Sequence, residues 1–323
     1  MNEDQIKIIL NQYSLGQINK ISPISCGLIN QTFLIETDSD SYIAQLMNKM
    51  YPPVVTEEYD KIQEYLAAHN FNIPKLVKTR TGQKYCFLKE QVFRIFNYVA
   101  HDSVDYSMIN NSLANQLGQA WGQLQRLLSQ YLEKPTFKLK NFHETRSIIE
   151  KLKAVNSANL EKSSAVENEY AMIVRDIENL YFSEPLANTV IHGDPKIFNL
   201  LIKNNQIVSV VDWDGIIWAS PLLELGDALR DWCQKDMIRF DFQVYNSAVE
   251  GYLSQYDLAV RRSAIAQATK LITLELAARF LTDYFEENYF SWDKIRYLSA
   301  AEHNLQRTRD CLAYYQDMCQ YVK

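Results

Sequence analysis

The chain lacks the features that mark nucleic-acid-binding and membrane-spanning proteins. It has no run of five or more Lys or Arg residues, and its net charge is −6 with an isoelectric point near 5.5. Nucleic acids are bound mainly through clustered positive charge, so we expect no nucleic-acid partner. No apolar stretch approaches the ~18 residues that cross a bilayer, so we expect no membrane partner either.

Disulfide and zinc chemistry are also poorly represented. The five cysteines are odd in number, widely spaced and free of CxxC pairs, which indicates neither a disulfide framework nor a zinc site. The opening MNEDQIKIIL is acidic where a secretory signal is basic, and it lacks a small-residue cleavage site. We therefore expect a cytoplasmic protein, and both a monomer and a homodimer stay open.

Length and composition are typical of a globular protein with two lobes. The chain has 323 residues, of which 47% are hydrophobic and 22% charged. A chain of this length usually forms more than one hydrophobic core. The periodicity changes near FNYVA without a Pro, Gly or Ser linker, so we expect lobes at residues 1–99 and 100–323 that share a hinge.

The first lobe has the pattern of an antiparallel sheet with one helix. Short, partly alternating segments typical of strands are ISPIS, QTFLIE, SYIAQLMN, KLVKT, KYCFL and VFRIFNYV. Between them, VVTEEYDKIQEYLAAHN changes to a helical period, with Val55, Tyr59, Ile62 and Leu66 on one face.

Beyond residue 100 the spacing of apolar residues is helical almost throughout. Helices are expected near residues 107–128, 144–155, 165–181, 222–234, 240–254, 259–286 and 297–319, with Ser107 as a cap of the first. Only TVI, LLIK and IVSVV interrupt this pattern as strands, with Asn204 and Asn205 as a turn. The expected fold class is α+β, with a large and mainly helical second lobe.

The segment TVIHGDPKIFNLLIKNNQIVSVVDWD gathers an unusual number of groups that can act on phosphate. Phosphoryl transfer needs a carboxylate that accepts the proton of the attacking hydroxyl, and oxygen ligands for Mg²⁺. Asp194 is the candidate base, Asn199 a neutral ligand and Asp212 the carboxylate that faces the metal. Asp194 and Asn199 are five residues apart, as in the protein-kinase catalytic loop.

Each of these residues also has a structural interpretation. A lone HGD is often only a turn, and we expect His192 to orient the loop and not to react. Asp214 shares a face with Asp212 in an extended segment, so it is either a metal ligand or a brace of the loop. The combination of residues, and no single one of them, indicates catalysis.

These motifs resemble a known superfamily. VIHGDPKIFNLLI followed by VVDWD is similar to the catalytic-loop motif of the aminoglycoside phosphotransferase and choline kinase superfamily, which has a bilobal protein-kinase-like fold. GLINQTFLIE, VFRIFNYV, NFHET, ELGDALR and LAARFLTDYFEENYF, in that order, resemble the N-acetylhexosamine 1-kinase subgroup, in which the anomeric hydroxyl of a sugar is phosphorylated. The resemblance implies ATP and Mg²⁺ as cofactors.

The resemblance also implies roles for individual residues. It makes Asp194 the base and Asn199 and Asp212 the Mg²⁺ ligands, and it makes Asp227 in ELGDALR a brace of the catalytic loop through backbone hydrogen bonds. The implied nucleotide contacts are Gly27 and Asn30 in the loop over the phosphates, Glu57 as the carboxylate of the first-lobe helix, and Phe96, Asn97 and Tyr98 in the hinge that docks adenine.

One position departs from the family pattern. Gln45 stands where this fold normally carries a Lys that holds the nucleotide phosphates. An amide still hydrogen-bonds a phosphate oxygen, but it contributes no charge. Lys49, four residues along the strand, is a candidate replacement. The departure also supports a second hypothesis, a catalytically silent nucleotide-binding protein on the same fold.

The acceptor site is expected in LAARFLTDYFEENYF. Arg279 and Asp283 are four residues apart on a helix, so Arg279 could bind the acceptor while Asp283 orients the guanidinium. The neighbouring aromatic rings suit a sugar pocket, whereas a surface salt bridge is the plainer interpretation. His143 and Glu144 could also touch the acceptor, or could cap the next helix through Thr145.

The expected function is therefore a Mg²⁺- and ATP-dependent kinase of a small-molecule hydroxyl, most simply the anomeric hydroxyl of an N-acetylhexosamine or related sugar. A third hypothesis is a kinase of an amino alcohol or aminoglycoside, because a negatively charged protein could offer an acidic cleft to a cationic acceptor.

Overall fold

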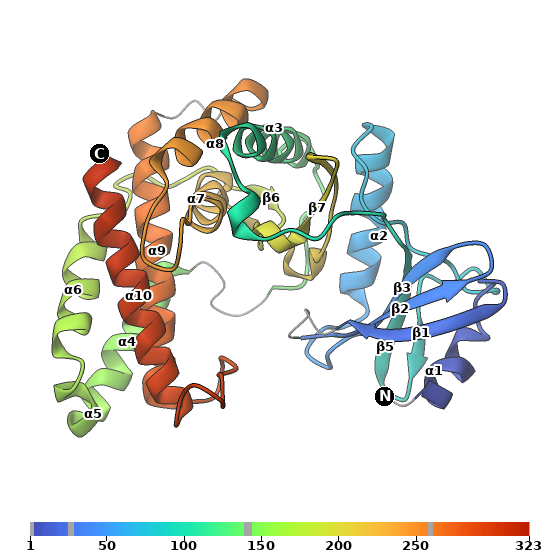
Figure 1. Ribbon diagram of the computed structural model, residues 1–323, viewed down its shortest axis with the longest axis horizontal. Helices are drawn as coiled ribbons and strands as arrows, with labels where there is room; N and C mark the ends of the chain where they lie inside the picture. The colour runs from blue at the N-terminus through green and yellow to red at the C-terminus, as the bar shows by residue number, and fades with distance from the viewer. Residues whose placement is uncertain (1–2, 25–28, 139–143, 258–260, 323) are drawn as a thin grey trace. The chain divides into compact units, whose positions relative to one another are not determined.

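The computed structural model describes residues 3–24, 29–138, 144–257 and 261–322 of the chain. The chain divides into two compact units, whose segments can be followed by colour in Figure 1. The first unit comprises Met1–Ser103, Glu133–Phe137 and Asn199–Ile216, and the second comprises Val104–Leu132, Lys138–Phe198 and Ile217–Lys323. The first unit thus includes a segment that lies far beyond residue 99 in the sequence.

An antiparallel sheet forms the centre of the first unit. Its strand order is β1-β2-β3-β5-β4. The strands are β1 (Ile18–Ile24), β2 (Gln31–Thr37), β3 (Ser41–Leu46), β4 (Cys86–Leu88) and β5 (Gln91–Asn97). The expected strand KLVKT is wrong, because this segment makes only isolated bridges, between Leu76 and Phe96 at the end of β5 and between Thr79 and Tyr13. The rest of that edge of β5 is already paired with β4.

Two helices and a hairpin complete the first unit. Helix α1 (Glu3–Leu10) buries its apolar side against the sheet residues Phe33, Ile35 and Ile95. Helix α2 (Val54–Ala68) buries the predicted face Val55, Tyr59, Ile62 and Leu66. The hairpin consists of β7 (Leu200–Lys203) and β8 (Gln206–Val210), and it is followed by the 3₁₀ turn η3 (Trp213–Gly215), which contacts α2.

The predicted hairpin turn is confirmed by the backbone. Asn204 and Asn205 have φ angles of 50° and 60°. Two successive residues with positive φ form the type of turn that matches the twist of paired strands, and Asn tolerates this conformation better than most residues.

The second unit is mainly helical. Its elements are η1 (Tyr106–Met108), α3 (Asn111–Leu128), α4 (Thr145–Ala158), α5 (Leu160–Ser164), α6 (Glu167–Glu178), β6 (Thr189–Ile191), β9 (Ile217–Ala219), α7 (Pro221–Trp232), α8 (Phe242–Gln255), α9 (Arg262–Glu286) and α10 (Ala300–Tyr321). The 3₁₀ turn η2 (Ile197–Asn199) ends at the unit boundary. β6 pairs with β9, a strand that the sequence analysis missed. The predicted α+β class is confirmed.

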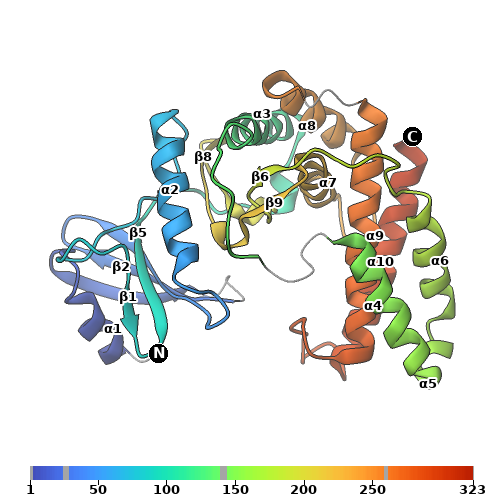
Figure 2. The same cartoon turned by 180° about the vertical axis from the view of Figure 1, so that it is seen from behind.

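Helix α9 forms the core of the second unit. It packs against α4, α6, α7 and α10, and Figures 1 and 2 show α4, α6, α9 and α10 side by side. Because α9 is surrounded by other helices, its buried residues lie on all sides, from Ile265 to Phe285. A helix enclosed in this way gives a rigid position to whatever follows its C-terminus.

Helices α3 and α8 cross closely because of two glycines. A Cβ on Gly118 would lie 2.0 Å from the carbonyl oxygen of Ala248, and one on Gly251 would lie 2.0 Å from that of Asn115. Helix α3 is capped by Asn110, whose Oδ1 accepts the N–H of Leu113, and not by Ser107 as expected. Ser107 belongs to the preceding 3₁₀ turn. Within the described residues, no helix combines the length and the apolar character that a membrane span requires.

Candidate active site

The loop after β6 carries His192, Gly193 and Asp194. Gly193 has a φ of 92°, a conformation that favours glycine, so the chain can turn sharply between the other two residues. The His192 ring is fully buried and lies edge-on to Trp121, with 5.7 Å between the ring centroids. Its Nδ1 accepts the N–H of Asp194 at 3.2 Å. His192 therefore fixes the backbone of the loop.

Helix α7 holds the same loop from one side. Glu224 accepts the N–H of Gly193 at 2.7 Å, Asp231 accepts the N–H of Ile197 at 2.7 Å, and Trp232 Nε1 donates to the carbonyl of Pro195 at 2.8 Å. Asp231 and Trp232 lie seven and eight positions after Glu224, which places all three residues on one face of the helix. One rigid helix thus positions three backbone groups of the loop.

Asp227 lies on the same helix and forms an ion pair with its neighbour Arg230 at 2.8 Å, one turn along the helix. The bracing hydrogen bonds that the structure describes come from Glu224 and Asp231. Burial raises the pKa of the Asp231 carboxyl, against the opposing influence of Arg230 and the N–H of Ile197. The sequence signal for Glu224 and Asp231 is that they are acidic residues on the apolar face of a helix.

A buried carboxylate that braces a loop leads to a test of stability. Replacement of Glu224 by Ala should lower the free energy of unfolding by about 1–3 kcal/mol, because the Gly193 N–H and the Gln125 amide lose a buried partner. Urea denaturation measures the change, and Glu250→Ala on an exposed face of α8 is the matched control. Equal losses in the two variants would contradict the bracing role.

Asp194 forms an ion pair with Lys196, which was not among the predicted site residues. Its carboxylate lies 2.5 Å from Lys196 Nζ, and both side chains are partly exposed. An ammonium group at this distance holds the carboxylate by a charge-assisted hydrogen bond, and it can also donate to a phosphate oxygen. The available signal was a cation two residues after the candidate base.

Asn199 and Asp212 lie at the open end of the β7–β8 hairpin. The N–H of Val211 donates to the carbonyl of Asn199 at 2.9 Å, which brings the two flanking segments together. Asp212 is exposed and has a left-handed backbone with a φ of 67°. Such a conformation is uncommon for a residue other than glycine, and it is found at functional sites.

The side-chain oxygens of Asn199 and Asp212 are of the kind that binds magnesium. Mg²⁺ is usually held by one or two protein carboxylates together with substrate phosphates and water. Among the described residues, no group of three or more His, Cys, Asp or Glu side chains could hold a metal by itself. A carboxylate and an amide oxygen therefore suit an ion that is shared with a nucleotide.

Asp214 has different surroundings from Asp212. Its carboxylate is buried and accepts Arg94 Nη2 at 2.6 and 2.8 Å and Asn30 Nδ2 at 2.8 Å. Asn30 Oδ1 in turn accepts the N–H of Asn48 at 2.9 Å. Gln45 Oε1 accepts Nε and Nη2 of Arg94 at 3.1 and 2.8 Å. Asn30, Gln45, Arg94 and Asp214 thus form one connected network within the first unit.

Two residues singled out in the sequence, Glu57 and Lys49, lie apart from this network. Glu57 lies outside it, since it is on the exposed side of α2 and accepts the Tyr85 hydroxyl at 3.1 Å. The α2 residue that reaches Arg94 is Thr56, one position earlier and on the buried face. Lys49 does not replace the missing charge, because β3 ends at Leu46 and Lys49 is exposed. The cation beside Gln45 is Arg94.

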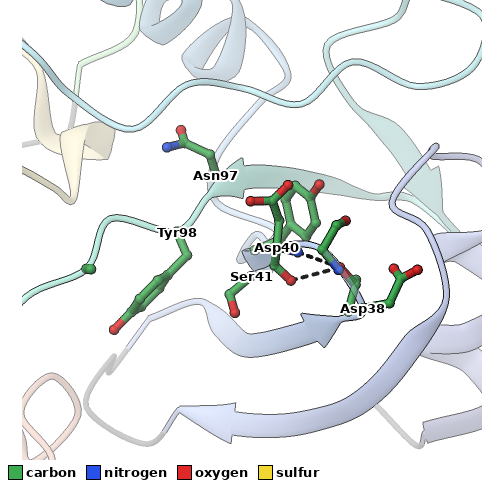
Figure 3. A pocket seen from close by; sticks show the side chains of 9 residues that line it. Asp38, Asp40, Ser41, Asn97 and Tyr98 are labelled. Atoms are coloured by element: carbon green, nitrogen blue, oxygen red, sulfur yellow. Dashed lines mark hydrogen bonds between the residues drawn. The ribbon is translucent and has the colours of Figure 1, made fainter.

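The hinge segment also limits how a nucleotide could bind. The N–H groups of Asn97 and Tyr98 donate to the carbonyls of Lys75 and Ser41, at 3.0 Å in each case. Their side chains point to opposite sides of the chain, and Tyr98 borders a hollow lined by the turn from Thr37 to Tyr42 (Figure 3). Asp38 and Asp40 line this hollow, so it is unsuited to a triphosphate. Phe96 is buried in the sheet, where its ring lies edge-on to Tyr59 and the Arg94 guanidinium lies over its face.

The predicted pairing of Arg279 with Asp283 is wrong. Asp283 is buried, and its oxygens accept the N–H groups of Asn288, Tyr289 and Phe290 at 2.8–2.9 Å, together with Asn304 Nδ2 at 2.9 Å. The carboxylate therefore holds the loop after α9, which folds back over the helix end. A spacing of four residues could not reveal this loop.

Arg279 contacts the aromatic rings of that loop. Its guanidinium lies 5.6 Å from the ring centroids of Tyr289 and Phe290 and donates to the Tyr289 hydroxyl at 3.3 Å. Arg307 lies 5.4 Å from the ring of Phe280 and is held by Asn304 Oδ1 at 3.1 Å. We name Arg279, Phe280, Tyr289, Phe290 and Arg307 the arginine–aromatic cluster.

The remaining predicted residues lie outside this cluster or outside the described residues. Glu144 forms an exposed ion pair with Lys138 and provides no side-chain cap to α4. Thr145 does not cap the helix either, since its hydroxyl donates to Glu275. Gly27 and His143 lie outside the described residues.

The chain matches a known enzyme family over most of its length. The model of the phosphotransferase enzyme family matches residues 20–259. The chain belongs to the phosphotransferase enzyme family. This finding confirms the predicted superfamily, and it establishes that the chain is an enzyme related to small-molecule kinases.

Curated relatives and solved structures agree with this assignment. A homoserine kinase of Zymomonas mobilis is 22% identical over 82% of this chain and 81% of its own length, and one of Methylobacillus flagellatus is 21% identical over 71% and 69%. The structure of amicoumacin kinase hAmiN with AMP-PNP and Ca²⁺ has a TM-score of 0.68 at 15% identity, covering 98% of this chain and 94% of that one.

A microcompartment-associated aminopropanol kinase has a TM-score of 0.67 at 15% identity, covering 100% of this chain and 99% of that one. These structures confirm the predicted kinase-like fold.

Proposed function

We propose that the chain is an ATP- and Mg²⁺-dependent kinase that phosphorylates a small-molecule hydroxyl with Asp194 as the base. The observation that carries this proposal is the loop around Asp194, whose backbone is held by His192, Glu224, Asp231 and Trp232. Such bracing is what a catalytic carboxylate needs, because an error of about 1 Å in position can cost 10²-fold in rate.

The proposed reaction uses few protein groups. The acceptor hydroxyl oxygen attacks the γ-phosphorus of ATP, the bond to the β,γ-bridging oxygen breaks, and Asp194 accepts the hydroxyl proton while ADP leaves. Lys196 forms an ion pair with Asp194, which holds the carboxylate in place. Asn199 and Asp212 would hold Mg²⁺, which when bound neutralises charge on the phosphates.

Adenine is proposed to bind the backbone of the hinge after β5. The N–H groups of Asn97 and Tyr98 are already engaged, so the nucleotide contacts should come from other backbone groups of the segment. ATP as the phosphate donor is supported by solved relatives whose structures contain AMP-PNP or ADP.

For the acceptor we propose an N-acetylhexosamine or a closely related neutral sugar, bound at the arginine–aromatic cluster. Aromatic faces pack against sugar rings, and guanidinium groups donate to hydroxyl and carbonyl oxygens. Both charged side chains of the cluster are cationic, and Asp283 is fully engaged by four donors. An ammonium group would therefore be repelled, which disfavours simple amino alcohols.

A second candidate acceptor is a hydroxy amino acid such as homoserine. It is supported by the curated relatives named homoserine kinase and by the guanidinium groups, which can pair with a carboxylate. The hypothesis of a catalytically silent nucleotide-binding protein is supported by Gln45 alone.

A matched set of acceptors separates these proposals. ADP release should be followed with N-acetylgalactosamine, galactosamine, homoserine, aminopropanol and choline at equal concentrations. We expect kcat/KM for the acetamido sugar to exceed that for the amino sugar at least about tenfold, since the two differ only in replacing an amide by an ammonium group. Preference for homoserine would select the second candidate, and preference for choline or galactosamine would overturn the sugar proposal.

A substitution tests the location of the acceptor site. Arg279→Ala should raise the KM for the acceptor at least about tenfold, equivalent to 1.4 kcal/mol, with the KM for ATP nearly unchanged. Steady-state kinetics measure both values. The matched control is Arg296→Ala, because Arg296 lies in the same region with an 80% exposed side chain. Unchanged KM values in a folded Arg279 variant would move the acceptor site elsewhere.

A further inference from the structure

Gln45 and Arg94 face each other across two strands of the sheet. The register pairs Gln45 of β3 with Arg94 of β5, so the two side chains emerge on the same face. Their neighbours Ala44, Leu46, Phe93 and Ile95 point to the other face, where they pack with α1. The face that carries Gln45 is therefore separate from the core around α1, and it includes Thr56 of α2 beside Arg94.

Arg94 determines which way the Gln45 amide points. A guanidinium group has only hydrogen-bond donors, so the Gln45 group that contacts it must be the carbonyl oxygen. Gln45 Oε1 accepts Arg94 Nε and Nη2 at 3.1 and 2.8 Å. The Nε2 group of Gln45 is consequently directed away from Arg94, while the Gln45 side chain stays partly exposed and Arg94 is only 2% exposed.

Asp214 balances the buried charge of Arg94. Its two oxygens accept Arg94 Nη2 at 2.6 and 2.8 Å, and both side chains are 3% exposed. An unpaired guanidinium would be costly to bury, so a counter-ion is required at this position. Asn30 Nδ2 donates to the same carboxylate, which links the segment before β2 to the network. Asp214 therefore serves as a brace, and Asp212 stays the ligand proposed for the metal.

We propose that Gln45 and Arg94 together replace the single lysine that usually holds the nucleotide phosphates. Gln45 Nε2 supplies the hydrogen-bond donor to a phosphate oxygen. Arg94 is a positioning residue, which fixes the orientation of the amide through its two hydrogen bonds to Gln45 Oε1. This inference rests on the proposed function only in that the chain must bind a nucleotide, and it accounts for an active kinase despite the Gln45 departure.

The interpretation as a plain structural ion pair makes different predictions. If Arg94 only stabilises the fold, its loss weakens the binding of every ligand of the first unit to the same extent. If it acts through Gln45, its loss weakens the binding of phosphates and leaves the nucleoside part unaffected. Binding of ATP and of adenosine, each measured by calorimetry, separates the two interpretations because adenosine lacks phosphate.

Three variants test the proposal. In Arg94→Met the Kd for ATP should rise about tenfold or more, while the Kd for adenosine changes less than about twofold. In the double variant Arg94→Met, Gln45→Lys, which moves the charge across the ladder from β5 to β3, ATP affinity should return to within about threefold of wild type. Gln45→Met keeps the Arg94–Asp214 pair, so it should fold normally and still lose ATP affinity about tenfold.

Each outcome decides the proposal. Equal losses for ATP and adenosine in Arg94→Met, no recovery in a folded double variant, or unchanged ATP affinity in Gln45→Met would overturn it. If Arg94→Met does not fold, the Gln45→Met result alone decides. Because these are binding measurements without acceptor, a wild-type chain that binds ATP but phosphorylates nothing would refute the proposed function and leave this inference intact.

Discussion

Replacement of Asp194 by Asn is expected to lower kcat by roughly 10²–10⁴ while the Kd for Mg²⁺-ATP stays within about twofold of wild type. Asn has nearly the same shape as Asp but cannot accept a proton, so only the chemical step should be affected. The loop should keep its position, because its backbone is held by His192 and by three side chains of α7. Single-turnover kinetics and calorimetry measure the two quantities separately.

The control for this substitution is another aspartate that forms a local ion pair. Asp236 in the second unit pairs with Arg239 at 2.6 Å and lies outside the proposed site. Asp236→Asn should leave kcat unchanged. A kcat for Asp194→Asn close to that of this control would remove Asp194 from the mechanism.

The second large effect is expected at Asp212. Asp212→Asn should abolish most Mg²⁺-dependent ATP binding, because the substitution removes the carboxylate proposed to join the metal to the phosphates. Asn is preferable to Ala here, since it tolerates the left-handed backbone with a φ of 67° that this position requires. The effect on metal binding is then not mixed with backbone strain.

Thermal unfolding with and without ligand measures this effect. A ligand present at about 100 times its Kd stabilises the wild type by about 2.7 kcal/mol. The Asp212 variant should lose most of the part of this stabilisation that depends on Mg²⁺, while ATP alone stabilises both proteins equally. Equal stabilisation of the two proteins by Mg²⁺-ATP would exclude Asp212 as a ligand.

The sequence was most informative where function depends on neighbours along the chain. The segment from Thr189 to Asp214 identified the loop and both strands of its hairpin, and its Asn-Asn turn has the expected backbone. Helical periodicity likewise located the buried face of α2, since each contact of that face repeats at a fixed spacing. Such features are determined locally, so a single sequence contains them.

Contacts between distant segments were not predictable in this way. Arg94 meets Gln45 only through the register of β3 with β5, and the alternative of Lys49 assumed that β3 continues beyond Leu46. Asp283 binds a loop that turns back after Glu287, whose φ is 53°, so the spacing to Arg279 was misleading. Thr56 and not Glu57 reaches Arg94 for a related reason, because one residue along a helix rotates a side chain by about 100°.

The most direct test of the account is acceptor-dependent release of ADP by the wild-type chain, measured beside Asp194→Asn at high enzyme concentration. We expect ADP formation that requires Mg²⁺, ATP and the acceptor, with one phosphorylated acceptor for each ADP and a rate at least about 10²-fold above the variant. A wild-type chain that binds ATP yet releases no more ADP than the variant with any acceptor would contradict the account, and would instead support a silent nucleotide-binding protein.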